Sequence, residues 1–335
     1  MIRWPLAKLL SPIGLDLGTH SFHAVQLRQS RGAWEPSAIL SLPRVTPGPA
    51  VSADEIGRLC GALERRGFVG REVVLAVPTF GLLSAMLELP PRAPGVPIET
   101  IAAAEFGRVH KLDPATVSMA MWDLPAPARA SRATFAMAVG VKSDALRTHV
   151  DVVESCGLRV VAVDEPLSAA ARGALANATP VGQTAIIDFG FYALRLAVVH
   201  GRTLAYTRTL LDAGTSTLLH AIAGEAKVEP AELERSLAQQ GATASAVPEA
   251  AVADMIGGHL DGVLREIGHA FTYTARQYPD VPIAAVRLVG GGALLPGVSA
   301  RCAATLGVPC TVCGDTAAPA PVTLARGLAL FGEAA

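Results

Sequence analysis

Two stretches of the chain place an aspartate two residues before a glycine, a pattern typical of a phosphate-binding turn. The first, IGLDLGTHSFHAVQL, spans residues 13–27 and contains Asp16, Gly18, Thr19 and Ser21. Glycine tolerates positive φ, so the tip of such a hairpin can turn its backbone N–H groups inward around an anion. The two hydroxyl groups add donors for phosphate. Asp16 precedes the turn and is a candidate ligand of Mg²⁺ through water, because this ion keeps several waters and takes few carboxylates.

The second stretch, IIDFGFYALRLAVV, repeats the outline of the first at residues 186–199. Asp188 and Gly190 take the places of Asp16 and Gly18. An Asp-x-Gly-Thr sequence is common by itself, and an ordinary hairpin explains a single copy. Two copies in the same context favour a phosphate clamp built from two related halves, with Asp188 as a second carboxylate for Mg²⁺.

Three consecutive glycines, Gly290, Gly291 and Gly292, follow an apolar run in the sequence LVGGGALLPGV. We expect a strand to enter them and a helix to leave them, which lets the backbone approach a ligand closely and points a helix N-terminus at it. A tight strand–helix turn without a ligand is the alternative. The spacing does not match G-x-G-x-x-G, so a Rossmann dinucleotide site is not expected.

The remaining signatures of common catalytic sites are missing from the sequence. His20 and His23 lie three residues apart on a predicted strand and therefore face opposite sides, which makes them poor ligands for one metal. The sequence contains no H-E-x-x-H, G-x-S-x-G or P-loop pattern. Zinc protease and serine hydrolase chemistry are therefore not expected.

Composition narrows the class of protein. A net charge of −1 without a basic block argues against nucleic acid as a partner. Apolar residues make up 51% of the chain and the mean hydropathy is +0.39, but much of this is alanine. No window approaches the ~20 apolar residues of a spanning helix. The N-terminal MIRWPLAKLLSPIG has no signal-peptide pattern, and we expect it to lead into the first strand rather than to touch a membrane. A cytoplasmic protein is predicted.

Five cysteines are too few and too unevenly spaced to indicate a disulfide framework. Cys310 and Cys313 form a lone C-x-x-C near Cys302, without a second pair or a nearby histidine. Because Cys310 alternates with valines on one face of a predicted strand, we interpret these cysteines as small buried side chains and expect no zinc site and no redox cofactor.

Hydrophobic periodicity predicts the elements that must position these residues. Strands are expected at residues 13–17, 21–28, 34–42, 73–77, 118–124, 134–141, 159–163, 185–189, 195–200, 204–211 and 284–289. Helices are expected at residues 52–66, 98–111, 143–156, 165–177, 215–226, 230–240, 247–278, 296–306 and 322–331. Ser52 and Glu55 predict a capping box at the start of the first helix. A strand-strand-strand-helix-strand plan is thus used twice.

The two copies predict two lobes with different insertions. The first lobe is expected to comprise residues 1–81 and 157–180, interrupted by a small α+β subdomain at 82–156. The second lobe is expected at 181–335, with a helical insertion around 225–279. A hinge between the lobes is expected at residues 177–184, NATPVGQT.

The three glycine elements, in this order and spacing, resemble those of the actin-like ATPase superfamily, which includes actin, sugar kinases and the cell-division protein FtsA. The likeness covers nearly the whole chain. Asp164-Glu165-Pro166-Leu167 and the alanines that follow are similar to the superfamily's connecting segment, with its E-P-x-x-A pattern. The resemblance implies an α/β, actin-like (duplicated ribonuclease-H-like) two-lobed fold with the small inserted subdomain in the first lobe.

Within the superfamily, the sequence most resembles the PilM family of type IV pilus assembly proteins. The phrases that agree are the G-x-D-x-G-T-x-S start, VVLAVP at 73–78, LELP at 87–90, VHGRT at 199–203, YTR at 206–208 and LGVP at 306–309. This resemblance implies a cytoplasmic scaffold, peripheral to the inner membrane, that touches the membrane only indirectly. Its implied partners are the cytoplasmic N-terminal tail of an inner-membrane PilN-like protein, held within residues 82–160, and other pilus machinery.

The resemblance also implies binding of ATP or ADP with Mg²⁺. The implied cofactor-binding residues are Asp16, Gly18, Thr19, His20, Ser21, Asp188, Gly190, Gly290, Gly291 and Gly292. Asp16 and Asp188 are the metal candidates, and together with Glu165 they are the catalytic candidates.

The second hairpin departs from the family pattern, which has a small residue and then hydroxyls after the glycine. Here the glycine is followed by Phe191-Tyr192-Ala193-Leu194, and in the first hairpin His23 stands where lysine is frequent. Phe191 would crowd a γ-phosphate, and the hydroxyl donors are missing. Electrostatic stabilisation supplies most of phosphoryl-transfer catalysis, so nucleotide binding with weak or no hydrolysis is expected.

Two alternatives share the fold. A small-molecule kinase needs a carboxylate to take the proton of a substrate hydroxyl, and Asp164, Glu165 and Asp212 are the candidates. The cytoplasmic domain of a type II secretion L-type protein is the other alternative. Such a protein continues into a transmembrane helix, which this chain is not expected to contain.

Overall fold

The computed structural model describes residues 10–128, 133–176, 182–230, 249–314 and 318–332. The predicted helix at 230–240, most of the predicted hinge and the N-terminal lead-in lie outside these residues. Among the described residues, no helix combines the length and apolar character needed to span a membrane.

The first half of the chain builds a five-stranded mixed sheet in the order β3-β2-β1-β4-β8. Its strands are β1 (Ile13–Leu17), β2 (Ser21–Ser30), β3 (Ala33–Pro43), β4 (Glu72–Ala76) and β8 (Arg159–Asp164). β1 is antiparallel to β2 and parallel to β4, and β4 is parallel to β8. Helices α1 (Ala53–Arg65) and α3 (Ser143–Glu154) contribute to the same apolar core as β1 and β4. The predicted capping box at Ser52 and Glu55 is confirmed.

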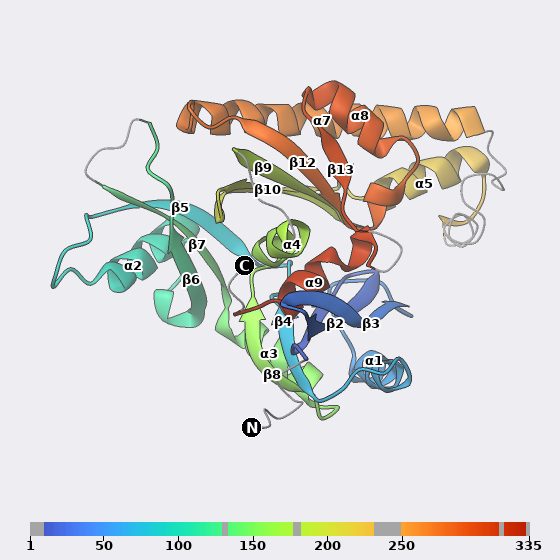
Figure 1. Cartoon of the computed structure of the whole chain (residues 1–335), viewed down its shortest axis with the longest axis horizontal. Coiled ribbons are helices and arrows are strands. Elements are labelled where there is room, and N and C mark those ends of the chain that lie inside the picture. Colours follow the sequence, from blue (N-terminus) through green and yellow to red (C-terminus); the bar gives the residue numbers. More distant parts are fainter. Residues whose placement is uncertain (1–9, 129–132, 177–181, 231–248, 315–317, 333–335) are drawn as a thin grey trace.

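The second half of the chain repeats this plan in the sheet β11-β10-β9-β12-β13. Its strands are β9 (Gln183–Phe189), β10 (Ala193–His200), β11 (Thr203–Leu211), β12 (Ile283–Val289) and β13 (Cys310–Val312). β9 pairs antiparallel with β10 and parallel with β12, as β1 does with β2 and β4. Helices α5 (Thr215–Ala226), α7 (Glu249–Gln277) and α8 (Val298–Leu306) cover one face (Figure 1). The equal order and pairing of the two sheets confirm the duplicated, two-lobed plan.

A third, antiparallel sheet in the order β5-β7-β6 lies beside the two lobes (Figure 1). It contains β5 (Leu83–Leu89), β6 (Val117–Asp123) and β7 (Thr134–Lys142), with α2 (Ile98–His110) packed on it and η2 (Pro114–Thr116) before β6. Its Trp122 donates from Nε1 to Leu204 O of β11 at 2.8 Å. The hydroxyl of Tyr278 donates to Pro125 O at 3.2 Å. The inserted sheet is therefore fixed to the second lobe as well as to the first.

Helices α4 (Pro166–Leu175) and α9 (Thr323–Ala329) cross between the two large sheets (Figure 1). α9 follows η5 (Ala320–Val322) and also packs on β1. Glycines allow these contacts, because a Cβ atom at Gly173 or Gly327 would collide with the backbone of the other helix, and one at Gly14 with that of α9. The end of the chain thus returns to the first sheet and ties the lobes together.

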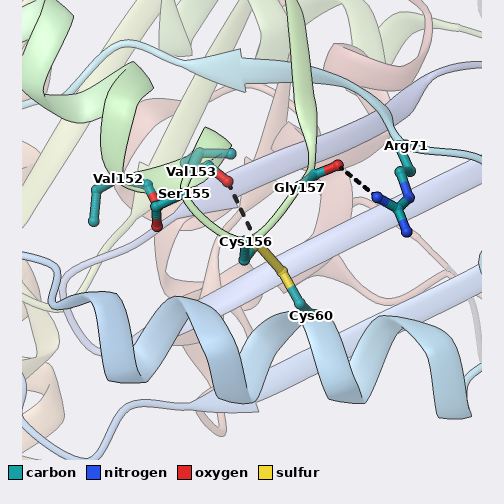
Figure 2. The surroundings of a disulfide bond; sticks show 7 residues. All are labelled: Cys60, Arg71, Val152, Val153, Ser155, Cys156 and Gly157. Carbon is teal, nitrogen blue, oxygen red and sulfur yellow. Dashed lines mark hydrogen bonds between the residues drawn. A yellow bond between two sulfur atoms is a disulfide. The ribbon is translucent and has the colours of Figure 1, made fainter.

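A disulfide bond joins Cys60 of α1 to Cys156, which follows α3 (Figure 2). The sequence did not predict it, because the two cysteines are 96 residues apart and only the shared face of the first sheet brings their helices together. The other three cysteines are free. Burial raises the pKa of the Cys302 thiol to about 12 and those of Cys310 and Cys313 to about 11, so all three stay protonated at neutral pH.

Candidate functional site

The turn between β1 and β2 is held in place by a buried arginine from the loop after β3. Arg44 Nη1 donates to Gly18 O at 3.4 Å and to Thr19 O at 3.5 Å, and Gly48 N donates to Thr19 O at 2.7 Å. The Arg44 side chain is 1% exposed and forms a 2.9 Å ion pair with Glu55, the residue that closes the capping box of α1. The tip of this first hairpin is thus connected to the start of α1.

The turn between β9 and β10 is held by main-chain groups instead. The N–H groups of Thr215 and Ser216, in the first turn of α5, donate to Gly190 O at 3.1 Å and to Phe191 O at 2.8 Å. Gly214 precedes them at the N-cap, where a Cβ atom would collide with the turn. The N-terminus of α5 is therefore occupied by the second hairpin.

Both turns need glycine for close approach and not for an unusual backbone conformation. A Cβ atom at Gly18 would lie 2.5 Å from Ser21 O, and one at Gly190 would lie 2.7 Å from Ala193 O. The prediction that Gly18 adopts positive φ to form an anion-binding nest is wrong, since neither glycine is among the positive-φ residues. The equal i to i+3 contact shows that the two turns are structural copies.

The tips of the two hairpins meet through aromatic rings. His20 stacks on Phe191, with ring centroids 4.1 Å apart and an interplanar angle of 15°. Tyr192 packs edge-on against Phe191 at 4.9 Å. We call the place where the hairpins meet the hairpin junction, comprising Asp16–Ser21, Asp188–Tyr192, His23 and Arg195. The stack joins the tips of the two predicted phosphate-binding turns.

A buried cation lies among the carboxylates of the junction. Arg195 of β10 is the cross-strand partner of Asp188 and forms an ion pair with it, the two side chains being 14% and 6% exposed. Arg195 Nη1 also donates to Thr79 Oγ1 at 3.2 Å, just after β4 of the first lobe. Burial raises the pKa of Asp16 to about 6, against the attraction of Arg195, and the charge of Asp188 adds to the rise.

His23 stands in the first hairpin where Arg195 stands in the second. It is the cross-strand partner of Asp16, as Arg195 is of Asp188. Burial lowers the pKa of His23 to about 4, so the ring is neutral at pH 7, and its Nδ1 lies 3.0 Å from Ser41 Oγ. The junction therefore takes its positive charge from the second hairpin.

Glu165, the third candidate catalytic carboxylate, serves as the N-cap of α4. Its two oxygens accept hydrogen bonds from Leu167 N at 3.0 Å and Ser168 N at 2.5 Å. Burial raises its pKa, against these two hydrogen bonds. Its neighbour Asp164 forms a 2.8 Å ion pair with Arg172. Both carboxylates already have partners within the protein.

The glycine-rich turn after β12 abuts the second hairpin. Gly290 has a φ of 82°, and a Cβ atom there would lie 2.7 Å from Phe189 O and collide with Asp188. At Gly292 a Cβ atom would lie 2.9 Å from that of Phe189. The helix that begins at these glycines is the short 3₁₀ helix η4 (Gly291–Leu294), whereas α8 begins only at Val298. The glycines here allow close packing against the second hairpin, and the predicted α-helix N-terminus does not lie at them.

The structure thus brings the three glycine elements together around Asp16 and Asp188. The sequence did not identify Arg195 or Arg44, which control charge and position there. The sequence could have predicted the pairing of Arg195 with Asp188. The two residues are separated by the spacing of a tight hairpin, which places them opposite each other on neighbouring strands. Arg44 had no such signal, since a single arginine in a proline-rich loop does not indicate what it contacts.

Comparison with known proteins gives one family match. The model of the family described as type IV pilus assembly protein PilM matches residues 14–318. A search of curated protein sequences matches none.

Solved structures give the fold. The chain is similar to a structure titled "PilM-PilN type IV pilus biogenesis complex", with 19% identity, 96% of this chain and 98% of that chain covered, and a TM-score of 0.77. It is also similar to ethanolamine utilization protein EutJ from Carboxydothermus hydrogenoformans (18% identity, 99% and 91% covered, TM-score 0.56). A third is MreB 5 of Spiroplasma citri bound to AMPPNP (14% identity, 96% and 95% covered, TM-score 0.53). These likenesses confirm the actin-like fold.

Proposed function

Because the chain belongs to the type IV pilus assembly protein PilM family, we propose that it is a cytoplasmic scaffold of pilus assembly that holds the tail of an inner-membrane PilN-like protein. The family match over residues 14–318 carries this proposal. The similar structure of a PilM–PilN complex supports the choice of partner. The protein would then be peripheral to the inner membrane through that partner.

A groove between the inserted sheet and the second lobe suits an extended peptide. It has a volume of about 200 Å³, and its apolar lining includes Met86, Met137, Phe135, Tyr206 and Tyr273. β5 is an edge strand of the inserted sheet, and Met86 on it is 48% exposed. A tail that adds to β5 through main-chain hydrogen bonds would place alternate apolar side chains in this groove.

A binding measurement with a matched pair of variants tests the scaffold proposal. Synthetic cytoplasmic tails of inner-membrane pilus proteins, labelled with a fluorophore, are titrated with the protein. Met86→Glu places a charge in the groove and is expected to weaken binding at least ~10-fold. Val109→Glu changes another exposed apolar residue of the same subdomain, on α2, and is expected to leave binding unchanged. Failure of the wild-type protein to bind any tail, together with phosphorylation of a metabolite, would sink the scaffold proposal.

We also propose that the hairpin junction binds ATP or ADP and hydrolyses it weakly or not at all. Binding is supported by the contact of the Gly290 turn with Asp188 and by the meeting of the two hairpin tips at His20 and Phe191. Three observations support weak hydrolysis: Phe191 stacks across the phosphate turns, Asp188 is paired with Arg195, and both oxygens of Glu165 cap α4. A free carboxylate to activate water would have to come from Asp16, whose pKa burial raises.

We propose the division of the chain at residues 82, 157 and 181 as the lobe and subdomain boundaries. The first sheet takes its strands from residues 1–81 and 157–180, the inserted sheet from 82–156 and the remaining sheet from 181–335, which supports this division. The kinase alternative needs an unpaired base near the junction, and the ion pair between Asp164 and Arg172 disfavours it.

A further inference from the structure

The charges of the hairpin junction place a protein cation where a metal ion would be needed. Asp16 on β1 and Asp188 on β9 lie in the junction, and Glu165 caps the start of α4. The electrostatic partners of the Arg195 guanidinium are Asp188, Asp16 and Glu165. Arg195 pairs directly with Asp188 and reaches Thr79 of the first lobe with its other arm. Arg195 therefore pairs with one carboxylate, Asp188, and the charges of Asp16 and Glu165 act on it from the first lobe.

This arrangement does not fit Mg²⁺. The ion requires near-octahedral oxygen ligands at ~2.0–2.1 Å and is usually held by one or two carboxylates and several waters. At the junction, Asp188 is already engaged by Arg195, and both oxygens of Glu165 accept main-chain N–H groups. A divalent cation near Asp16 and Asp188 would also lie close to the guanidinium and be repelled by it. In the part of the chain that the structure describes, no three His, Cys, Asp or Glu side chains form a group able to hold a metal.

We propose that Arg195 replaces the divalent cation of the nucleotide site, so that nucleotide binding by this protein does not require Mg²⁺. A guanidinium has five N–H donors and is always protonated, so the donors of Arg195 that Asp188 and Thr79 leave open can bind phosphate oxygens without a metal. The inference deepens the proposed nucleotide binding and rests on it.

Only the second hairpin carries a residue that can replace the divalent cation. His23 is the equivalent residue of the first hairpin and is neutral at pH 7, so it offers no second cation. The tip of the second hairpin carries Phe191 and Tyr192 in place of hydroxyl donors. Arg195 is therefore the one charged donor on the second hairpin that faces Asp188 across the strand pair.

The first experiment measures ADP affinity by isothermal titration, with Mg²⁺ or with EDTA. For the wild-type protein the two affinities are expected to agree within twofold. Arg195→Met is expected to weaken ADP binding at least tenfold in EDTA, with partial recovery when Mg²⁺ is added. Arg208→Met is the matched control, because Arg208 also pairs with a carboxylate, Glu266 at 2.6 Å, but lies on β11. A tenfold or larger loss of wild-type affinity in EDTA would overturn the proposal.

The second experiment uses a metal probe and no nucleotide, so that it gives a result even if the protein binds no ADP. Tb³⁺ luminescence is followed for the wild-type protein, Arg195→Met and Arg195→Lys. Arg195→Met is expected to gain a Tb³⁺ site that is lost again when Asp16→Asn is added. Arg195→Lys keeps the charge and is expected to bind no more Tb³⁺ than the wild type.

The two experiments separate the two proposals. Lack of ADP binding under every condition, with the Tb³⁺ site gained in Arg195→Met, would defeat the nucleotide proposal and leave Arg195 as the replacement for the cation. Equal Tb³⁺ binding by the wild-type protein and Arg195→Met would overturn the role of Arg195. Circular dichroism of each variant checks the fold, and Arg195→Lys provides the comparison if Arg195→Met does not fold.

Discussion

In the first hairpin a buried side chain holds the turn, whereas in the second hairpin a helix end holds it. Arg44 donates to the carbonyl groups of Gly18 and Thr19, and the first turn of α5 donates to those of Gly190 and Phe191. The strand pairing and the close contact at the glycines are the same in both. The two hairpins therefore share one backbone geometry, but different groups donate the hydrogen bonds that hold their turns.

The chemistry of the two hairpins differs more than their backbones. The first has Thr19, Ser21 and the neutral His23, which suit hydrogen bonding to an anion. The second has Phe191 and the cation Arg195. The tips of the two hairpins are in contact, because the ring of His20 stacks on that of Phe191. Two hairpins of the same backbone geometry therefore differ in charge, because the second carries the only one of the two cross-strand residues that is charged at pH 7.

Arg44→Met is expected to have the largest effect on stability. It removes the hydrogen bonds that the Arg44 side chain donates to the turn of the first hairpin and leaves the second hairpin unchanged. The change leaves Glu55 buried without its partner and is expected to lower the free energy of unfolding by about 3–5 kcal/mol, measured by urea denaturation. Thr215→Ala is the counterpart in the second hairpin, where the main-chain N–H makes the bond, and is expected to cost under ~1 kcal/mol. Equal losses would show that both turns depend on side chains.

Alanine at the two glycines tests whether the turns are equivalent. Gly18→Ala and Gly190→Ala each place a methyl group against a carbonyl oxygen and are expected to destabilise the protein by similar amounts, about 1–3 kcal/mol. Gly57→Ala, in α1 with nothing within 4 Å of the added atom, is the control and is expected to stabilise by about 0.5–1 kcal/mol. A large difference between Gly18→Ala and Gly190→Ala would break the comparison.

The neutral state of His23 predicts a pH dependence that the second hairpin lacks. Its pKa is lowered from 6.5 to about 4, so between these values the folded state binds fewer protons than the unfolded state. The stability is therefore complete above pH 6.5 and lost as the pH falls toward 4. Between pH 7 and pH 4, chemical denaturation is expected to show that the wild-type protein loses about 3 kcal/mol more of its free energy of unfolding than His23→Asn does.

His269→Asn is the control for this pH series, because His269 is 67% exposed on α7. It is expected to keep the acid sensitivity of the wild-type protein. The same slope in the wild-type protein and His23→Asn would mean that folding does not lower the pKa of His23.

The smallest effect is expected from opening the aromatic stack. Phe191→Gly removes the ring that faces His20 and is expected to raise ATP affinity about tenfold, measured by isothermal titration. Phe191→Leu keeps a bulky side chain and is expected to give a smaller gain. Unchanged ATP affinity in Phe191→Gly would contradict the idea that the ring occupies space needed by phosphate.

The sequence alone determined the local structure and the duplication. Alternating and continuous apolar runs predicted the strands of the two large sheets, and Ser52 with Glu55 predicted the capping box, because short-range patterns control these features. The repeated Asp-x-Gly pattern predicted two related hairpins, and Phe191, which we predict to crowd a γ-phosphate, stacks on His20 at the turn of the second.

The contacts between these local elements depend on the tertiary packing. The stack of His20 on Phe191, the disulfide between Cys60 and Cys156 and the support of the first turn by Arg44 join residues that are distant in sequence. Their formation depends on how helices and sheets pack, which spacing along the chain does not specify. The charge of the junction depends on burial as well, since burial makes His23 neutral and raises the pKa of Asp16. The two hairpins are thus readable in the sequence, whereas the pairing of Arg195 with Asp188 and its contact with Thr79 depend on how the strands and the lobes pack.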